Sequence, residues 1–396
     1  MKQRLLVFEL VLFGLLFSSM FPFQAVLASS PAQAGPAAEP VVLCLPGIYS
    51  ASRRDCTPAG PSQYLTDLAS AGIVLPIPPL PAAPIDPALA QIDTRYAEVI
   101  NKGAPVYGSI ADAVAGNKKQ AARTLNGDFV YISYSEMQEV SGKKIYTIAP
   151  GAWMRGADLS RIGVLPAQQG LVFSRTPTSA FGWMLNYWAP GPLETRYTPG
   201  GNSTGRVLNL YEVVPVFGEQ SLDEETWYRI GPDEWVQQKY IARVTPNTTP
   251  PNGVAGDRWI EVNLFEQTLA VYDKRQLVFA TIIASGIDPF WTRPGLFQVY
   301  KKLEKTDMSG ATLADRSDAY FLQDVPWTLY YDDARALHGA YWRAKMGFTQ
   351  SHGCINLTVG DAHWLFDWAA EGDWVYVWDP SGVTPVDPSL YGPGGY

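Results

Sequence analysis

An internal repeat is the feature of this sequence that most restricts its fold. Residues 146–154, Tyr-Thr-Ile-Ala-Pro-Gly-Ala-Trp-Met, match residues 228–236, Tyr-Arg-Ile-Gly-Pro-Asp-Glu-Trp-Val, at an offset of 82 positions. Residues 159–162 match residues 241–244 at the same offset. Chance similarity between aromatic strands would not be expected to keep the same offset from residue 146 to residue 162. It indicates two copies of one module of about 70–80 residues each.

Each copy has the pattern of a small β-domain. Alternating runs such as Phe129–Tyr134 and Glu212–Phe217 predict strands. The 35 Gly and 32 Pro residues favour β-rich modules joined by turns. The repeated Tyr-x-Ile-x-Pro-x-x-Trp pattern resembles bacterial SH3-like domains, which are small β-barrels. The resemblance implies a mainly β fold with minor α content, in which Trp153 and Trp235 are matched core positions.

The composition excludes two broad classes of protein. Hydrophobic residues make up 47% of the 396 positions and charged residues 17%, so the chain has enough apolar side chains to build cores and is not wholly disordered. The 30 Lys and Arg residues against 38 Asp and Glu residues give a net charge of −8 without a basic run. We therefore expect no nucleic-acid partner.

The N-terminus has the pattern of an export signal. Lys2 and Arg4 precede an apolar run, Leu10–Phe23, and Val26–Ala28 offers a cleavage site before Ser29. An uncleaved N-terminal anchor is the alternative, because the apolar segment is nearly long enough to cross a bilayer. In either case we expect the protein to be exported.

Export places the three cysteines in an oxidising environment. Cys44 and Cys56 are close in sequence, and we predict a disulfide between them, which would add about 2–3 kcal/mol to stability. Two free thiols are the alternative. Cys354 is then the unpaired cysteine, and a free thiol in an exported protein indicates a function.

A third unit follows the two modules. Trp259–Leu264 opens a new series of alternating strands, and Thr358 with Asp361 predicts a capped helix. The predicted units are a signal peptide or anchor at 1–28, a disulfide loop and short helix at 29–75, a Pro-rich linker at 76–88, module 1 at 89–165, module 2 at 166–247, a linker at 248–256, the third unit at 257–379 and a Pro/Gly-rich tail at 380–396.

The third unit contains every histidine of the chain and its unpaired cysteine, namely His338, His352, Cys354 and His363. A thiol is mostly protonated near neutral pH, so it needs a neighbouring base to act as a nucleophile. His338 comes from a separate segment and is free to meet Cys354 across a site. Gly353 allows a substrate carbonyl to approach the backbone closely. We assign His363 to surface or packing.

Two other interpretations of this cluster are open. A zinc site would use His338, His352 and Cys354, but the paired cysteines typical of structural zinc sites are absent from the sequence. A buried cysteine among core histidines would leave the gathering of all histidines unexplained. We therefore expect no metal and no cofactor.

The cluster also carries a family resemblance. The pair His338–Gly339 followed by Ser351–Leu357, Ser-His-Gly-Cys-Ile-Asn-Leu, resembles the signature of the YkuD-type L,D-transpeptidase catalytic domain of bacterial cell walls. The resemblance extends over about Asp257–Trp378 and includes the turn Thr292–Phe297. It implies a β-rich catalytic domain that carries out acyl transfer on peptidoglycan stem peptides.

The resemblance implies a role for each residue of the motif. Cys354 would attack the carbonyl before the terminal D-alanine of a tetrapeptide stem, and His338 would take the thiol proton and return it to the leaving amine. The Gly339 carbonyl would orient the imidazole. His352 and the amides of Gly353 and Cys354 would hold the oxyanion. The expected substrate-binding residues are Gly339, Tyr341, Ser351, Asn356 and Arg343, with Lys345 as an alternative to Arg343.

The acyl group would then pass to an amine of another stem, which cross-links the wall. The protein would therefore be associated with the cell wall, act without a cofactor and be trapped by carbapenems. Transfer to water, an L,D-carboxypeptidase activity, is an alternative. A wall-binding protein with an idle third unit is another. The modules are expected to carry no chemistry, so that residues 256–380 alone would remain active.

Overall fold

The computed structural model describes residues 42–44, 56–57, 59–127, 129–310 and 319–392. The predicted signal segment at 1–28 lies outside them. Within the described residues strands dominate and the helices are short: α1 (Pro61–Ser70), α2 (Ile110–Ala115) and α3 (Val359–Trp368). The fold is therefore mainly β, as predicted. No helix in this described part of the chain is long and apolar enough to span a membrane.

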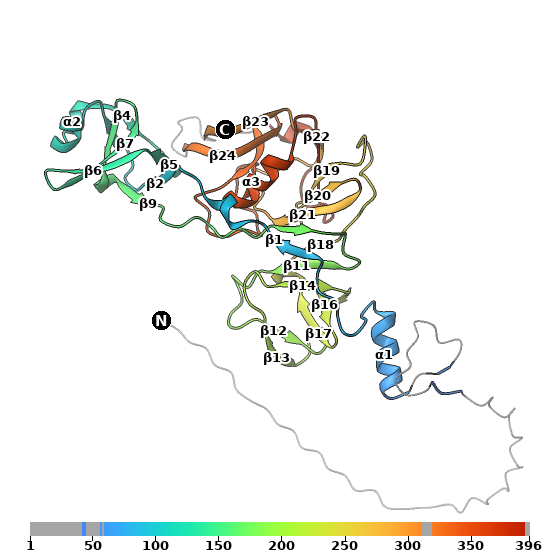
Figure 1. The fold of residues 1–396 in the computed structure, drawn as a ribbon. Helices are drawn as coiled ribbons and strands as arrows, with labels where there is room; N and C mark the ends of the chain where they lie inside the picture. The colour runs from blue at the N-terminus through green and yellow to red at the C-terminus, as the bar shows by residue number, and fades with distance from the viewer. Residues whose placement is uncertain (1–41, 45–55, 58, 128, 311–318, 393–396) are drawn as a thin grey trace, which may run out of the picture.

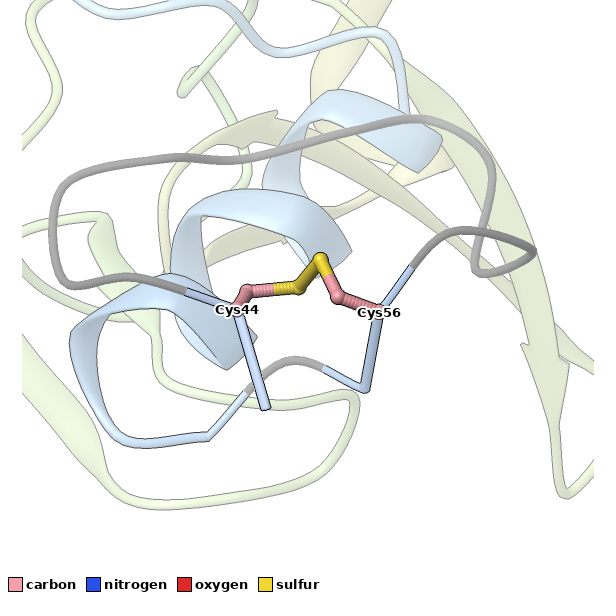
Figure 2. The surroundings of a disulfide bond; sticks show 2 residues. All are labelled: Cys44 and Cys56. Carbon is pink, nitrogen blue, oxygen red and sulfur yellow. A yellow bond between two sulfur atoms is a disulfide. The ribbon is translucent and has the colours of Figure 1, made fainter. Parts of the chain in front are cut away.

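The N-terminal region contains the predicted disulfide and helix. Cys44 and Cys56 are joined with their Cα atoms 5.0 Å apart (Figure 2). Helix α1 begins at Pro61, and its N-cap residue is Gly60, which makes no side-chain cap. Ser62, the expected cap, is instead buried within the helix.

The sequence repeat corresponds to a repeat of strand order. In module 1 one sheet runs β4-β3-β8-β7-β6, and in module 2 the equivalent sheet runs β13-β12-β17-β16-β15. The remaining strands repeat as β5-β2-β9 and β14-β11-β18. The strands of module 1 are β2 (Arg95–Val99), β3 (Ala104–Tyr107), β4 (Ala121–Leu125), β5 (Phe129–Tyr134), β6 (Glu136–Val140), β7 (Lys143–Ala149), β8 (Ala152–Arg155) and β9 (Leu159–Arg161). Those of module 2 are β11 (Ala180–Met184), β12 (Glu194–Arg196), β13 (Ser203–Val207), β14 (Val213–Val216), β15 (Gly218–Leu222), β16 (Glu225–Gly231), β17 (Glu234–Gln237) and β18 (Ile241–Val244).

The repeated motif supplies equivalent core residues to the two modules. The matched pairs Tyr146 and Tyr228, Ile148 and Ile230, and Met154 and Val236 are all buried. The matched tryptophans Trp153 and Trp235 are both only partly buried. Trp153 still packs against a second, smaller core cluster of module 1, which contains Tyr107, Ala113 and Ile145, whereas the Arg229 guanidinium lies over the Trp235 ring. The SH3-like assignment of the modules stays a prediction.

The C-terminal domain has two sheets. The first runs β1-β10-β21-β20-β19-β27-β22, and the second runs β26-β25-β24-β5-β2-β9 with β23 paired to β24. Their strands, apart from those of module 1, are β1 (Ala82–Pro84), β10 (Leu171–Phe173), β19 (Trp259–Asn263), β20 (Thr268–Asp273), β21 (Gln276–Ile282), β22 (Gly295–Gln298), β23 (Lys301–Gly310), β24 (Tyr320–Asp332), β25 (Arg335–Gly339), β26 (Ile355–Leu357) and β27 (Trp374–Trp378). Figure 1 shows the two modules on different sides of this domain.

Segments outside the predicted third unit thus complete its sheets. Strand β1 falls within the predicted Pro-rich linker, yet it pairs with β10, which pairs with β21. Pro84 is compatible with this position, because β1 is an edge strand and an edge strand does not need every N–H donor. Residues 82–84 of the predicted linker are therefore part of a sheet.

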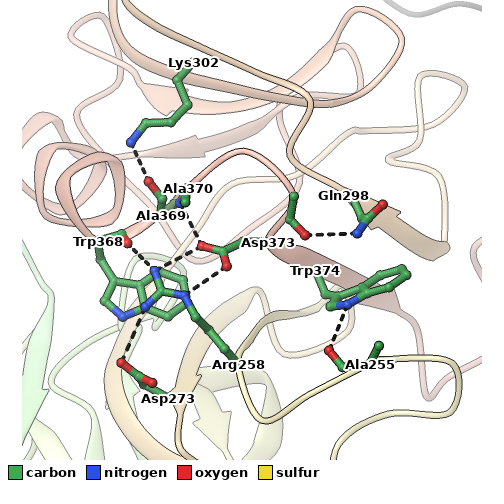
Figure 3. Close-up of polar contacts among 11 residues, drawn as sticks. Ala255, Arg258, Asp273, Gln298, Lys302, Trp368, Ala369, Ala370, Asp373 and Trp374 are labelled. Carbon is green, nitrogen blue, oxygen red and sulfur yellow. Dashed lines mark hydrogen bonds and ion pairs between the residues drawn. The ribbon is translucent and has the colours of Figure 1, made fainter.

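Helix α3 is fixed at both ends. Thr358 caps its N-terminus by accepting from the Asp361 N–H, as predicted. At its C-terminus, Arg258 pairs with Asp373, donates to the Trp368 carbonyl and covers the Trp368 ring (Figure 3). Lys302 donates to the carbonyls of Phe366 and Ala369. These two cations satisfy carbonyls that the helix end leaves without partners.

Candidate active site

Two neighbouring strands bring the sequence motifs together. Strands β25 and β26 are parallel, and His338 pairs in register with Asn356, two positions after Cys354. The motif residues line a cavity of about 30 Å³. The complete lining is Phe129, Met308, Tyr320, Leu322, His338, Trp342, Arg343, Ser351, His352, Cys354 and Asn356. Six of these are residues that the sequence predicted for the site: His338, Arg343, Ser351, His352, Cys354 and Asn356.

The loop that carries the thiol is held by its own hydrogen bonds. The Ser351 hydroxyl donates to the Cys354 carbonyl at 2.6 Å and accepts from the Gly353 N–H at 3.2 Å. The Thr292 hydroxyl donates to the Gly353 carbonyl at 2.9 Å. Gly353 has a φ of +108°, which favours glycine. Its N–H therefore holds the turn, and this differs from the predicted oxyanion role of that amide.

The Cys354 thiol is free and partly buried. Its Sγ lies 3.8 Å from the Ala334 carbonyl, which accepts the weak S–H hydrogen bond. Burial raises the pKa of the thiol, while the Ala336 N–H and the charge of Arg335 act in the opposite direction. The group is therefore a protonated thiol at neutral pH, and its reaction requires a base.

His338 is the base that the cavity offers. Its side chain is 2% exposed, and burial lowers its pKa to about 4. The nearby charge of Arg343 lowers the pKa further, and the bond to the Gly339 carbonyl opposes the shift. Nδ1 lies 3.4 Å from that carbonyl. When Nδ1–H donates there, Nε2 keeps its lone pair, so the ring is a neutral base at neutral pH.

Arg343 contributes a cation whose partners are all neutral. It donates to Asn356 Oδ1 at 3.0 Å, to Gln350 Oε1 at 2.9 Å and to the Gln350 carbonyl at 2.5 Å. Burial lowers its pKa to about 10, so it stays charged at neutral pH. No carboxylate of the described residues lies within ion-pair distance of it. Lys345, the alternative predicted cation, lies over the Tyr187 ring at 4.7 Å and does not line the cavity.

His352 stands at the rim of the cavity. Its side chain is exposed, and its ring contacts Phe290 at 4.6 Å and stacks on Tyr320 at 5.2 Å between centroids. Burial raises the pKa of Tyr320, and the nearness of Cys354 adds to the shift. Tyr320 is therefore a neutral hydroxyl beside the thiol.

Tyr341, Gly339 and His363 lie outside the cavity lining, as do Gly353 and Lys345. Tyr341 is 1% exposed, stacks on Tyr96 and donates its hydroxyl to the Gln323 carbonyl, so it supports the site from behind and does not face a substrate. Gly339 lies against Pro326, where an added Cβ would be 3.1 Å from Cγ. His363 stacks on Trp327 at 3.8 Å, the packing role predicted for it.

Sequence reasoning did not assign several nearby residues to the site, among them Phe129 and Arg335. Phe129 comes from module 1, and no local motif marks it as a cavity residue. Arg335 is buried in an ion pair with Asp332, and its Nε lies 3.3 Å from where a Cβ on Gly353 would be. An arginine within a buried strand was a signal that went unused. Among the described residues, no three His, Cys, Asp or Glu side chains are grouped to hold a metal ion.

Comparison with known families identifies the domain that contains this cavity. Residues 257–377 match the family model YkuD, described as the L,D-transpeptidase catalytic domain. The C-terminal domain is thus a YkuD L,D-transpeptidase catalytic domain, as the sequence resemblance implied. The match covers less than a third of the chain. Comparison with curated proteins returned no match.

Several solved structures are similar to part of this chain. The catalytic domain from the E. faecium L,D-transpeptidase, solved acylated by ertapenem, is 28% identical and aligns over 32% of this chain and 100% of that chain, with a TM-score of 0.28. The L,D-transpeptidase from Mycobacterium smegmatis is 16% identical over 55% of this chain and 95% of that chain, with a TM-score of 0.30. The L,D-transpeptidase from Stackebrandtia nassauensis is 21% identical over 32% and 57%, with a TM-score of 0.26. The chain spans about half the length of several matched proteins.

Proposed function

We propose that this protein is an exported L,D-transpeptidase that cross-links peptidoglycan through a thioester at Cys354. The observation that carries the proposal is the cavity itself. It joins a free thiol and a neutral, buried imidazole within a domain that matches the L,D-transpeptidase family model. An idle domain would have no need to retain this pair.

The first half-reaction uses the thiol as nucleophile. The S–H hydrogen turns from the Ala334 carbonyl toward His338, which accepts the proton as sulfur bonds to the stem carbonyl carbon. The C–N bond to the terminal D-alanine then breaks, and His338 returns the proton to the leaving amine. The amine leaves as a neutral molecule, and the acyl group remains bonded to sulfur.

The second half-reaction returns the free thiol. An amine of another stem attacks the thioester carbonyl and loses its proton to His338, and the C–S bond breaks. Sulfur regains the proton from His338. The energy of the original peptide bond is kept in the thioester, so the reaction needs no nucleotide.

Arg343 would hold the stem carboxylate. A cation in a partly buried site, bonded to neutral acceptors, favours a bound anion, and the donor stem ends in a carboxylate next to the scissile bond. The Ser351 hydroxyl would act by holding the loop that carries Cys354. Asn356 would act by holding Arg343 in place. His352 at the rim would stabilise the oxyanion or the leaving amine.

The test is incubation of the protein, starting at Ser29, with defined tetrapeptide muropeptides, followed by mass analysis of products and of the protein. We expect an acyl-enzyme mass lacking D-alanine and dimeric muropeptide in excess of free tripeptide. Tripeptide in excess even with abundant acceptor would instead establish a carboxypeptidase. A carbapenem should form a stable adduct on the wild-type protein and none on Cys354→Ser, because a hydroxyl is much harder to activate than a thiol.

A further inference from the structure

Module 1 supplies part of the wall of the thiol cavity. We propose that Phe129 is a substrate-contact residue, and that its ring forms the apolar wall against which the aliphatic part of the donor stem packs. Module 1 then completes the acyl-donor site. The inference rests on the proposed function for the identity of the substrate, while the placement of Phe129 beside Cys354 is a property of the fold.

Strand pairing fixes the position of Phe129. Strand β5 lies in parallel beside β24, with Phe129 opposite Tyr320 and Tyr131 opposite Leu322 (Figure 1). Side chains alternate along a strand. Phe129 and Tyr131 therefore face the catalytic domain, where both belong to a cluster with Leu322, whereas Val130 faces the core of module 1.

Ring contacts continue from Phe129 to the base. Phe129 packs edge-on to Tyr131 at 4.9 Å and to Trp342 at 6.4 Å. Trp342 in turn lies 5.7 Å from His338. The wall formed by module 1 is thus part of the same apolar surroundings as His338, whose pKa burial lowers.

Hydrogen bonds hold the two domains in this register. The Ser133 hydroxyl donates to Asp324 Oδ2 at 2.5 Å, and the Tyr96 hydroxyl donates to the Asp324 carbonyl at 2.8 Å. Gln323 donates to the Ile148 carbonyl at 3.3 Å. All three bonds join module 1 to β24, so Phe129 is held by a fixed contact of the fold.

The cavity lining contains side chains of two kinds, and a stem peptide has matching parts. Arg343 and Asn356 are polar, and Phe129, Met308 and Leu322 are apolar. The donor stem presents a carboxylate and aliphatic side chains on either side of the scissile carbonyl.

The first experiment measures access to the thiol in the full chain. Cys354 is alkylated with iodoacetamide, which is small, and with N-phenylmaleimide, which is bulky and apolar. Phe129→Ala should raise the rate with the bulky probe about tenfold relative to the small one, because removal of the ring opens the wall. Phe129→Leu should give an intermediate ratio. Val130→Ala, the adjacent residue on the opposite face, should keep the wild-type ratio, and thermal unfolding reports its effect on stability.

The second experiment measures acylation by a tetrapeptide donor. Phe129→Ala should lower kcat/KM about tenfold, mainly through KM, and Phe129→Leu should restore most of it. Val130→Ala should keep the wild-type value at temperatures where it is folded.

The outcomes distinguish the proposed role of Phe129 from the proposed function of the protein. An unchanged ratio of probe rates in Phe129→Ala overturns the assignment of Phe129 to the cavity wall. A changed ratio with unchanged donor kinetics overturns the substrate contact. Wild-type protein that is alkylated at Cys354 but forms no acyl-enzyme overturns the proposed function, and with it the substrate role of Phe129.

Discussion

The two copies of the repeated module have the same strand order but contact the catalytic domain differently. In module 1 the strand β5 pairs with β24 and places Phe129 in the cavity. The equivalent strand of module 2, β14, is an edge strand of its sheet. Module 2 meets the catalytic domain through Glu266, which accepts from Tyr228 and Arg243, and through the loop after Arg343, whose Met346 N–H donates to the Tyr211 hydroxyl. Of the two copies, only module 1 contributes a residue to the lining of the thiol cavity.

The composition of the two strands gives a physical reason for this difference. Module 1 has Phe129, Tyr131 and Ser133 on the side of β5 that meets the catalytic domain, and these residues supply rings and a hydrogen-bond donor. Strand β14 contains Pro215, which lacks an N–H. Proline on an edge strand hinders pairing with a further strand.

The largest effect should come from removing both modules. The fragment 256–380 loses β5, β1 and β10, and Asp361 loses the Gln169 and Gly170 N–H groups that it accepts from. The sequence alone led us to expect an active fragment. The missing strands β5, β1 and β10, however, belong to the two sheets of this domain. We now expect the fragment to lose cooperative unfolding and nearly all acylation of soluble tetrapeptide.

The matched control is the chain 76–392, which keeps both modules and lacks the disulfide loop. It should unfold cooperatively and form the acyl-enzyme at the wild-type rate. Calorimetry and mass analysis of the acyl-enzyme measure the two properties. An active, cooperatively folded 256–380 fragment would show that module 1 is dispensable.

The contact that module 2 makes through Glu266 should matter for stability and not for chemistry. Glu266 is buried, and its removal leaves Arg243 without its buried partner. Glu266→Ala should therefore lower the free energy of unfolding by about 3 kcal/mol. The rate of acylation by tetrapeptide at a temperature where the variant is folded should stay unchanged.

Glu219 offers a matched control for this test. It pairs with the same Arg243, but its side chain is 60% exposed. Glu219→Ala should cost less than about 1 kcal/mol, because exposed ion pairs contribute little. Denaturant unfolding measures both variants. A large loss of acylation in Glu266→Ala would mean that module 2 also shapes the site.

The pH dependence of stability tests how well the cavity beside module 1 excludes water. The unfolded imidazole of His338 has a pKa of 6.5 and the folded one a pKa of about 4, so between these values protonation favours the unfolded state. The contribution of neutral His338 to the free energy of unfolding is complete above pH 6.5 and is lost as the pH falls toward 4. It amounts to about 3 kcal/mol over this window.

His338→Gln isolates this contribution, because other buried groups titrate equally in both proteins. The difference in unfolding free energy between wild type and variant should change by that amount between pH 7 and pH 4. Phe129→Ala should reduce the change by letting water reach the ring. If the unfolding free energies of the wild type and of His338→Gln changed with pH in parallel, the His338 imidazole would be solvated.

The sequence predicted the chemistry of the site better than its construction. His338, Cys354 and Arg343 lie in one cavity, and the sequence could group them because a thiol needs a base and residue type and spacing carry that requirement; their roles stay predictions. The bond from the Gly353 N–H to the Ser351 hydroxyl could not be foreseen, because the two residues are only two positions apart and the sequence does not give the geometry of their turn. Phe129 was missed because its place depends on a parallel pairing between strands far apart in the chain, which no local pattern encodes.

A smaller loss of stability than that of Glu266→Ala should come from removing a single hydrogen bond between module 1 and β24, and it gives the sharpest contrast with module 2. Ser133→Ala removes the donor to Asp324 Oδ2 and should cost about 1.5 kcal/mol, since the acceptor is charged. The matched control is Ser135→Ala, whose exposed hydroxyl lies 3.4 Å from the Thr147 carbonyl and should cost about 0.5 kcal/mol or less. Because β24 also carries Tyr320 and Leu322 of the cavity, Ser133→Ala should lower the acylation rate severalfold, although it costs half as much stability as Glu266→Ala. Unfolding and acylation measured on Ser133→Ala, Ser135→Ala, Glu266→Ala and Glu219→Ala would then fail to correlate. A simple correlation between the two properties would mean that both modules act through stability alone.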